Sequence, residues 1–99
     1  MVLAQNIYWS EKQMNGRKRG FIEIVGDILS SLHQTKLKKS HISHNCNLDP
    51  RSTTKYLKII LNLKLVEQSE DLKFYVITQK GIKFLNQFIN LTDFLKNNH

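Results

Sequence analysis

Cations and hydroxyl groups recur on one side of a short segment between residues 48 and 64, while apolar side chains occupy its other side. Guanidinium, ammonium and hydroxyl groups bind phosphate oxygens and base edges, and an arginine can contact a guanine edge through two hydrogen bonds. The candidate DNA-contacting residues of this segment are Arg51, Ser52, Thr54, Lys55 and Lys58. Their pattern is typical of a recognition helix that enters the major groove of double-stranded DNA.

A second set of cations lies outside this segment and makes the chain strongly basic. The sequence contains 15 Lys and Arg residues against 8 Asp and Glu, for a formal net charge of +7. Residues 33–64 hold seven of the basic residues and one acidic residue, Asp49, and residues 17–19 are Arg-Lys-Arg. Such clustering favours a polyanionic partner over the alternative, a merely solvated basic face. We expect further phosphate contacts from Lys36, Lys38, Lys39, Arg17, Lys18 and Arg19.

Other chemistry is poorly supported by the sequence. His41, His44 and Cys46 have a spacing that resembles a metal site, but a structural zinc site needs four well-placed ligands and Cys46 is expected to face the core. Cys46 and Ser40 lack a third group that would orient a neighbouring histidine for nucleophilic catalysis. We therefore predict no metal, no cofactor and no catalytic residue. A histidine near DNA would gain a positive charge near pH 6, which is an alternative role for this cluster.

Helical spacing and capping residues predict three helices that would position the cations. A first helix over 21–32 carries an apolar stripe at intervals of three and four residues, and Gly26 within it suggests a close contact with another helix. A short helix over 39–45 should turn Ile42 and Cys46 inward. The third helix, over 50–63, begins with Asp49 as its N-cap and Pro50 at its first position.

A hairpin and a long helix complete the expected order. Residues 65–68 and 73–77 are rich in β-branched and aromatic side chains and predict two strands joined by a turn. Thr78 should cap a final helix, over 79–97, whose apolar residues recur at spacings of 4, 3 and 4. These residues are predicted to form a dimerisation seam, the alternative being that they serve the core alone: Phe84, Phe88, Leu91 and Leu95.

This order predicts an α+β fold, mostly α, of the winged helix-turn-helix type. A three-helix core and a β-hairpin wing would occupy residues 21–78, the long C-terminal dimerisation helix residues 79–97, and an irregular or flexible N-terminal arm residues 1–20. With a single cysteine the chain can form no internal disulfide, so a reducing compartment fits best. No apolar run approaches the roughly 20 residues of a membrane span. We expect a cytoplasmic protein that associates with the nucleoid.

Residues 17 to about 95 resemble the small archaeal winged helix-turn-helix DNA-binding proteins, the "ten-a" chromatin-protein type and related transcriptional regulators. The clearest stretch is Tyr-Val-Ile-Thr-Gln-Lys-Gly-Ile-Lys-Phe-Leu at 75–85, a motif that recurs after the wing in several winged-helix families. The resemblance implies a homodimer joined by antiparallel C-terminal helices, with Arg51, Ser52, Lys55 and Lys58 facing the groove.

Two features depart from that family pattern. Thr53 stands where an apolar residue is usual, so the start of the third helix is expected to sit differently. Glu67, Glu70 and Asp71 make the wing acidic, which argues against contact between the wing and phosphates. We predict a double-stranded DNA-binding protein, either a transcriptional regulator or a small chromatin protein. The alternative is a winged-helix module that binds an acidic protein and no nucleic acid.

Overall fold

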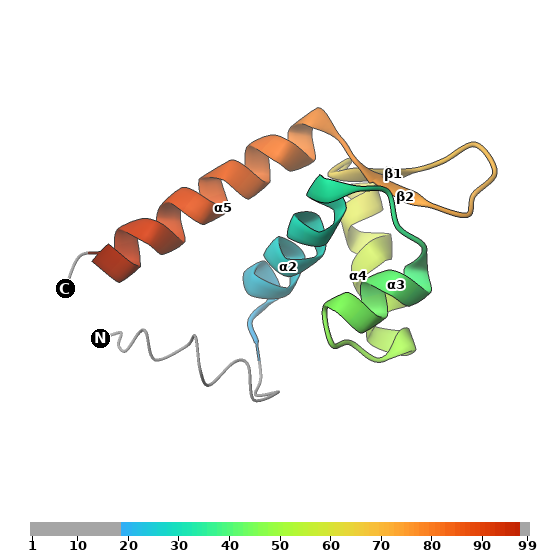
Figure 1. The fold of residues 1–99 in the computed structure, drawn as a ribbon, viewed down its shortest axis with the longest axis horizontal. Helices are drawn as coiled ribbons and strands as arrows, with labels where there is room; N and C mark the ends of the chain where they lie inside the picture. Colours follow the sequence, from blue (N-terminus) through green and yellow to red (C-terminus); the bar gives the residue numbers. More distant parts are fainter. Residues whose placement is uncertain (1–18, 98–99) are drawn as a thin grey trace.

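The computed structural model describes residues 19–97 as three packed helices, a two-stranded hairpin and a long final helix (Figure 1). The elements follow the order α2 (Phe21–Gln34), α3 (Lys39–Asn45), α4 (Pro50–Asn62), β1 (Val66–Gln68), β2 (Tyr75–Ile77) and α5 (Gln79–Asn97). This order confirms the predicted winged helix-turn-helix, with a long C-terminal helix that extends away from the rest of the fold (Figure 1). Within residues 19–97, no helix is both long and apolar enough to cross a membrane.

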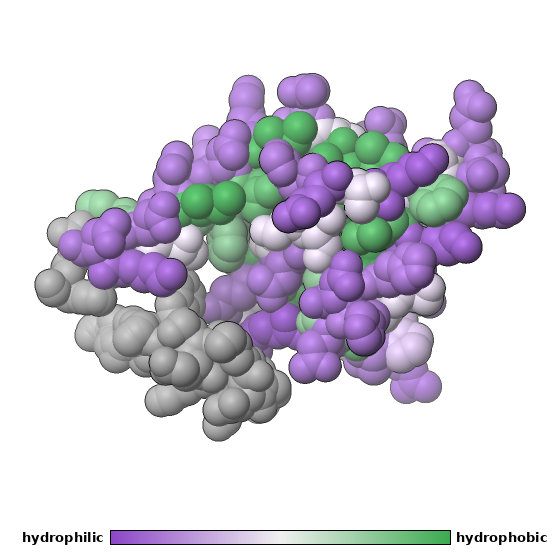
Figure 2. All heavy atoms as spheres, viewed as in Figure 1, coloured by the Kyte–Doolittle hydropathy of each residue, from purple (hydrophilic) through white to green (hydrophobic). Residues whose placement is uncertain are grey.

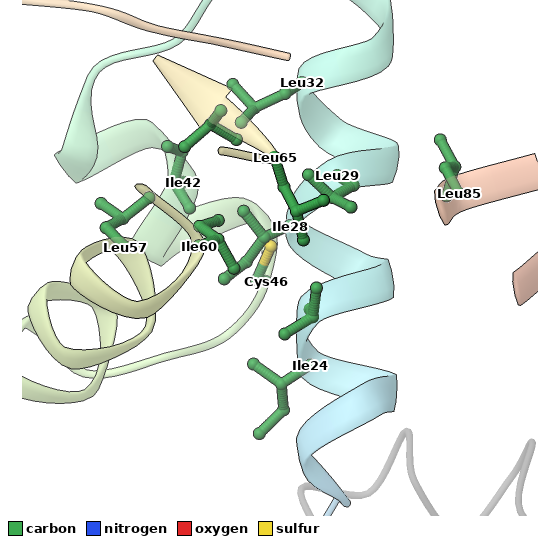
Figure 3. Packing of buried hydrophobic residues seen from close by; sticks show 12 residues of the cluster. Ile24, Ile28, Leu29, Leu32, Ile42, Cys46, Leu57, Ile60, Leu65 and Leu85 are labelled. Carbon is green, nitrogen blue, oxygen red and sulfur yellow. The ribbon is translucent and has the colours of Figure 1, made fainter. Parts of the chain in front are cut away.

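The core lies between α2 and the pair formed by α3 and α4. Ile28, Ile42 and Ile60 are fully buried there and point toward one another from three different helices (Figure 3). Cys46 is also buried, with 4% of its surface exposed, and its thiol lies 3.7 Å from Oγ of Ser31. The inward orientation predicted for Ile42 and Cys46 is therefore confirmed, and burial raises the pKa of the Cys46 thiol.

The hairpin is antiparallel and joins the helical core at its base. Val66 pairs with Ile77 and Gln68 with Tyr75. Tyr75 also exchanges two backbone hydrogen bonds with Leu37, of 2.8 and 3.2 Å, so the connection between α2 and α3 pairs with the second strand. The hairpin is thereby fixed relative to the helices.

The strands are shorter than predicted because neighbouring backbone groups bond elsewhere. Leu65 donates its N–H to Ile60 and accepts from Thr78, which ties it to the ends of two helices. Lys73 and Phe74 donate their N–H groups to Asp71 and Ser69 inside the turn. These residues therefore belong to the connections, and each strand keeps three residues.

Capping side chains begin α4 and α5 where the sequence indicated. The carboxylate of Asp49 accepts a hydrogen bond of 3.2 Å from the N–H of Ser52, and Pro50 is the first residue of α4. Oγ1 of Thr78 accepts a hydrogen bond of 3.0 Å from the N–H of Gly81 at the start of α5. Both side chains satisfy N–H groups that a helix cannot bond internally.

Helix α5 packs across α2 at Gly26, which confirms the close contact predicted there. A methyl group at residue 26 would lie 2.5 Å from Cε2 of Phe88, so glycine is needed for the ring to approach. Phe84 and Phe88 are half-buried against the core, whereas Leu91 and Leu95 are 54% and 49% exposed. The predicted dimerisation seam is thus divided, because its first two residues pack within their own chain.

We expect Gly26→Ala to lower the thermal midpoint of the otherwise unchanged protein, because the new methyl group meets the Phe88 ring. In a Phe88→Ala background the same substitution should raise the midpoint, since alanine favours a helix over glycine by about 1 kcal/mol. For a domain of this size that gain corresponds to roughly 4–8 °C. Thermal unfolding of the wild type, the two single variants and the double variant, followed by circular dichroism, measures the change in midpoint in both backgrounds. A lower midpoint in both backgrounds would show that Phe88 does not limit residue 26.

Candidate nucleic-acid interface

The polar face of α4 and the start of α3 form one basic surface. Arg51, Lys55 and Lys58 are exposed at intervals of three to four residues, so they share one side of the helix. Lys39, at the start of α3, joins them in lining a shallow surface groove that also includes Thr54. In the view of Figure 2, hydrophilic side chains dominate the surface over α3. We call Lys39, Arg51, Thr54, Lys55 and Lys58 the basic face.

The positive charge of the basic face has little local compensation. The acidic residue nearest in sequence to α4 is its N-cap, Asp49, and no acidic residue occurs between 50 and 64. Nζ of Lys55 lies 5.7 Å from the ring centroid of Tyr56, whose ring in turn lies 5.8 Å from that of Phe21. Tyr56 therefore lies between Lys55 and Phe21 of α2, while Arg51, Lys55 and Lys58 remain exposed.

The two hydroxyl residues predicted to contact DNA are already engaged with the start of α4. Oγ1 of Thr54 donates a hydrogen bond of 3.0 Å to the carbonyl of Pro50. Hydrogen bonds from the side chain and backbone of Ser52 hold the pKa of the Asp49 carboxyl below its ordinary value. In this arrangement Ser52 and Thr54 have fewer donors to offer a phosphate than the cations beside them.

A buried hydrogen bond joins the two helices that form the basic face. Thr53 is fully buried, and its Oγ1 accepts a hydrogen bond of 2.6 Å from Oγ of Ser43 in α3. The same hydroxyl donates to the carbonyl of Asp49, at 2.9 Å. The polar residue that departs from the family pattern thus has both partners it needs, and Ser43 was not identified from the sequence because nothing local marks it.

Thr53→Val should lower the free energy of unfolding by about 1 kcal/mol, because the partly buried Ser43 hydroxyl loses its acceptor. Adding Ser43→Ala should recover most of that loss, since replacing both partners with apolar groups of similar shape is close to neutral. Urea denaturation of the two single variants and the double variant measures the coupling. A double-variant loss equal to the sum of the single losses would mean that the two hydroxyls act independently.

A family model described as winged helix-turn-helix matches residues 18–96. The chain belongs to the winged helix-turn-helix family. In the terms of this family, α3 and α4 are the helix-turn-helix, α4 is the recognition helix, and β1 with β2 is the wing. No curated protein sequence matches the chain significantly.

Solved structures with the same fold include proteins from an archaeon and a bacterium. Sso10a-2, a DNA-binding protein from Sulfolobus solfataricus, is 23% identical with a TM-score of 0.68, over 80% of this chain and 84% of that one. ZitR of Lactococcus lactis, a zinc-responsive MarR family member, is 21% identical with a TM-score of 0.61, over 68% of this chain. A C30S mutant of ZitR is 16% identical with a TM-score of 0.59, over 91% of this chain and 75% of that one. This chain spans half the length of the first ZitR structure, and identities this low show the fold alone.

The wing of this winged helix-turn-helix protein carries acidic residues at its turn, and lysines lie beside that turn. Oδ1 of Asp71 accepts hydrogen bonds from Oγ of Ser69, at 2.6 Å, and from the N–H of Lys73, at 3.1 Å, which lower the pKa of the Asp71 carboxyl. Beside this turn, Nζ of Lys36 and of Lys38 lie 4.6 and 5.9 Å from the ring centroid of Phe74, and the charge of Lys36 also lowers the pKa of the Asp71 carboxyl. Lys38 therefore sits between the basic face and the wing.

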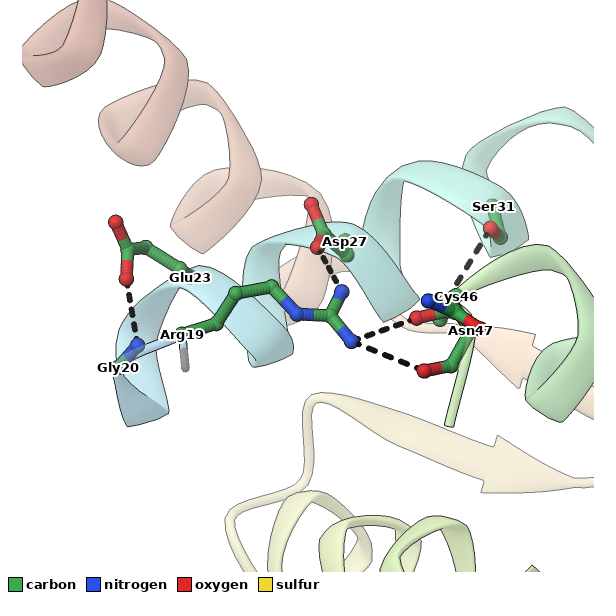
Figure 4. A network of polar contacts seen from close by, with 7 residues as sticks. All are labelled: Arg19, Gly20, Glu23, Asp27, Ser31, Cys46 and Asn47. Atoms are coloured by element: carbon green, nitrogen blue, oxygen red, sulfur yellow. Dashed lines mark hydrogen bonds and ion pairs between the residues drawn. The ribbon is translucent and has the colours of Figure 1, made fainter. Parts of the chain in front are cut away.

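The structure gives Arg19 partners within the fold. Its guanidinium forms an ion pair of 2.8 Å with Asp27 of α2 and donates to the carbonyls of Cys46 and Asn47, at 2.8 and 3.3 Å (Figure 4). The Arg19 side chain is only 16% exposed, so we leave it out of the basic face. The neighbouring candidates, Arg17 and Lys18, lie outside the described residues, as does most of the predicted arm 1–20.

The histidine and cysteine cluster does not converge on one point. His41 and His44 are exposed on α3, whereas Cys46 is buried in the core. Within residues 19–97, no three His, Cys, Asp or Glu side chains are grouped so that they could hold a metal ion.

Proposed function

We propose that this winged helix-turn-helix protein binds double-stranded DNA through its basic face and acts, without enzymatic activity, as a transcriptional regulator or a small chromatin protein. The observation that carries the proposal is the convergence of Lys39 with Arg51, Lys55 and Lys58 on one exposed side of α3 and α4. An exposed basic helix of this kind fits the major groove. A nucleoid-associated place in the cytoplasm follows from this function.

The cations of this region take different roles in this proposal. Arg51, near the start of the recognition helix, is best placed for a bidentate contact with a guanine edge. Lys39, Lys55, Lys58 and Lys38 would pair with phosphates, which fixes register and supplies affinity independent of sequence. The description of Sso10a-2 as a DNA-binding protein supports the same function for a chain with its fold.

We also propose that two copies associate through the distal part of α5. This helix extends away from the three-helix core (Figure 1), and Leu91 and Leu95, which share one side of it, expose 54% and 49% of their surface. An exposed apolar stripe on a protruding helix favours burial against a second copy. Antiparallel pairing of two such helices would hold two recognition helices on one DNA molecule.

The alternative function is a protein-interaction module that binds no nucleic acid, and the acidic wing favours it. Glu67, Glu70 and Asp71 are exposed along the wing and would repel phosphates. Fluorescence anisotropy with a labelled random-sequence duplex at moderate salt separates the two functions. Saturable binding is expected if the basic face contacts DNA, whereas an absence of binding would exclude DNA as the partner and leave the interaction module.

A further inference from the structure

The turn that orients the recognition helix is held from outside by Arg19. This turn consists of Cys46 and Asn47, at the C-terminal end of α3, followed by Leu48 and Asp49 before α4. Nη2 of Arg19 donates to the carbonyls of both Cys46 and Asn47, while its Nη1 pairs with Asp27 on α2 (Figure 4). One side chain therefore connects α2 to the turn of the helix-turn-helix.

The local backbone explains why this turn needs an external partner. Carbonyls at a helix C-terminus lack N–H donors within the helix and carry partial negative charge, so a guanidinium stabilises them. Asn47 has a φ of 55°, in the left-handed region that asparagine adopts more readily than most residues with a side chain. The end of α3 thus presents two carbonyls in one direction, and Arg19 meets both.

We propose that Arg19 and Asp27 are positioning residues for DNA recognition: together they form a latch that fixes the turn between α3 and α4 and thereby the direction of the recognition helix. This inference rests on the proposed DNA-binding function. The latch works through geometry, since Asp27 orients the guanidinium from α2 while the guanidinium holds the turn. Neither residue needs to contact DNA.

The competing role for Arg19 is the direct phosphate contact suggested by its place in the Arg-Lys-Arg run. The two roles differ in what the loss of Asp27 does. If Arg19 binds phosphate, Asp27→Ala frees the guanidinium and removes a negative charge, so DNA affinity stays equal or rises. If the latch positions α4, the same substitution lowers affinity although the protein has become more basic.

The experiment measures duplex affinity at several salt concentrations for the wild type, Arg19→Ala, Asp27→Ala and a control, Asp93→Ala. Asp93 is exposed on α5, on the side of that helix opposite Leu91 and Leu95, so the control removes the same charge without touching the latch or the proposed dimer contact. We expect both latch variants to bind about tenfold more weakly, a factor equivalent to 1.4 kcal/mol, with the control unchanged. The slope of log affinity against log salt should stay the same, because no phosphate contact is lost.

When the wild type binds duplex DNA, two results of this experiment would overturn the inference. Wild-type or higher affinity in Asp27→Ala excludes a positioning role, and a slope reduced by about 0.9 in Arg19→Ala identifies a direct phosphate contact. Amide hydrogen exchange gives a second test that needs no DNA and remains valid if a variant is destabilised. Asp27→Ala should accelerate amide exchange at residues 46–49 more than in α5. An equal acceleration in both segments would contradict the latch. If the wild type itself binds no duplex, the proposed function fails instead, and hydrogen exchange alone still decides whether the latch holds the turn.

Discussion

Replacing Arg51 and Lys55 together with alanine should weaken binding to duplex DNA by about a hundredfold, with the fold intact. The loss of a bidentate contact to a base costs about 1–3 kcal/mol, and the loss of a phosphate contact weakens binding to all sequences. Both side chains are exposed on α4, and the helix is held by the buried Leu57 and Ile60 on its other side. The thermal midpoint should therefore hardly change.

A matched variant separates the basic face from net charge. Lys83 and Lys96 are exposed on α5, so replacing both with alanine removes the same two charges away from the basic face. This control should lose only a small part of the affinity. Equal losses in the two double variants would contradict the assignment of α4 as the recognition helix and would indicate binding by overall charge.

Replacing Leu91 and Leu95 with glutamate should convert the proposed dimer into a monomer. Both side chains are about half exposed in a single chain, and burying a leucine fully contributes about 1.5–3 kcal/mol. In a symmetric dimer each substitution acts twice, and four carboxylates would then face one another across the seam. Sedimentation equilibrium should report half the wild-type mass. The thermal midpoint of the winged-helix domain should stay close to that of the wild type.

The choice of residues matters for this test. Phe88 belongs to the same predicted seam but packs on Gly26, so Phe88→Glu would place a carboxylate against the core and destabilise the fold. Asn90→Glu is the matched control, because Asn90 is exposed on the same helix. A wild-type mass for the leucine double variant would reject α5 as the dimer contact.

A monomeric variant should also bind DNA more weakly, since two linked winged-helix domains bind with a higher effective concentration than one.

The parts of the fold that depend on local sequence were predictable. Asp49 and Pro50 mark the start of α4, and Thr78 marks the start of α5, because a cap acts within three residues of itself. Gly26 indicated the helix contact because only a missing side chain allows two helices to approach closely. The positions of Arg51, Lys55 and Lys58 on one side of α4 follow from helical spacing alone.

The parts that depend on distant residues were not predictable. Arg19 stands in a run of cations and looks like a phosphate contact, but its partners lie 8, 27 and 28 residues away. Phe84 and Phe88 have the same helical spacing as Leu91 and Leu95. Only the crossing of α5 over α2 buries the two phenylalanines and leaves the two leucines on the surface. The bond between Ser43 and Thr53 likewise exists because two helices meet at those positions.

The salt dependence of duplex binding tests the central claim most directly. Four phosphate contacts are proposed for each copy of the chain, from Lys38, Lys39, Lys55 and Lys58. Neutralising four phosphates gives a slope of about −3.6 in log affinity against log salt. We expect a slope near this value for each bound copy of the wild-type chain. In Lys58→Ala the magnitude of the slope should fall by about 0.9. A slope near zero, or no binding at low salt, would contradict DNA recognition by the basic face.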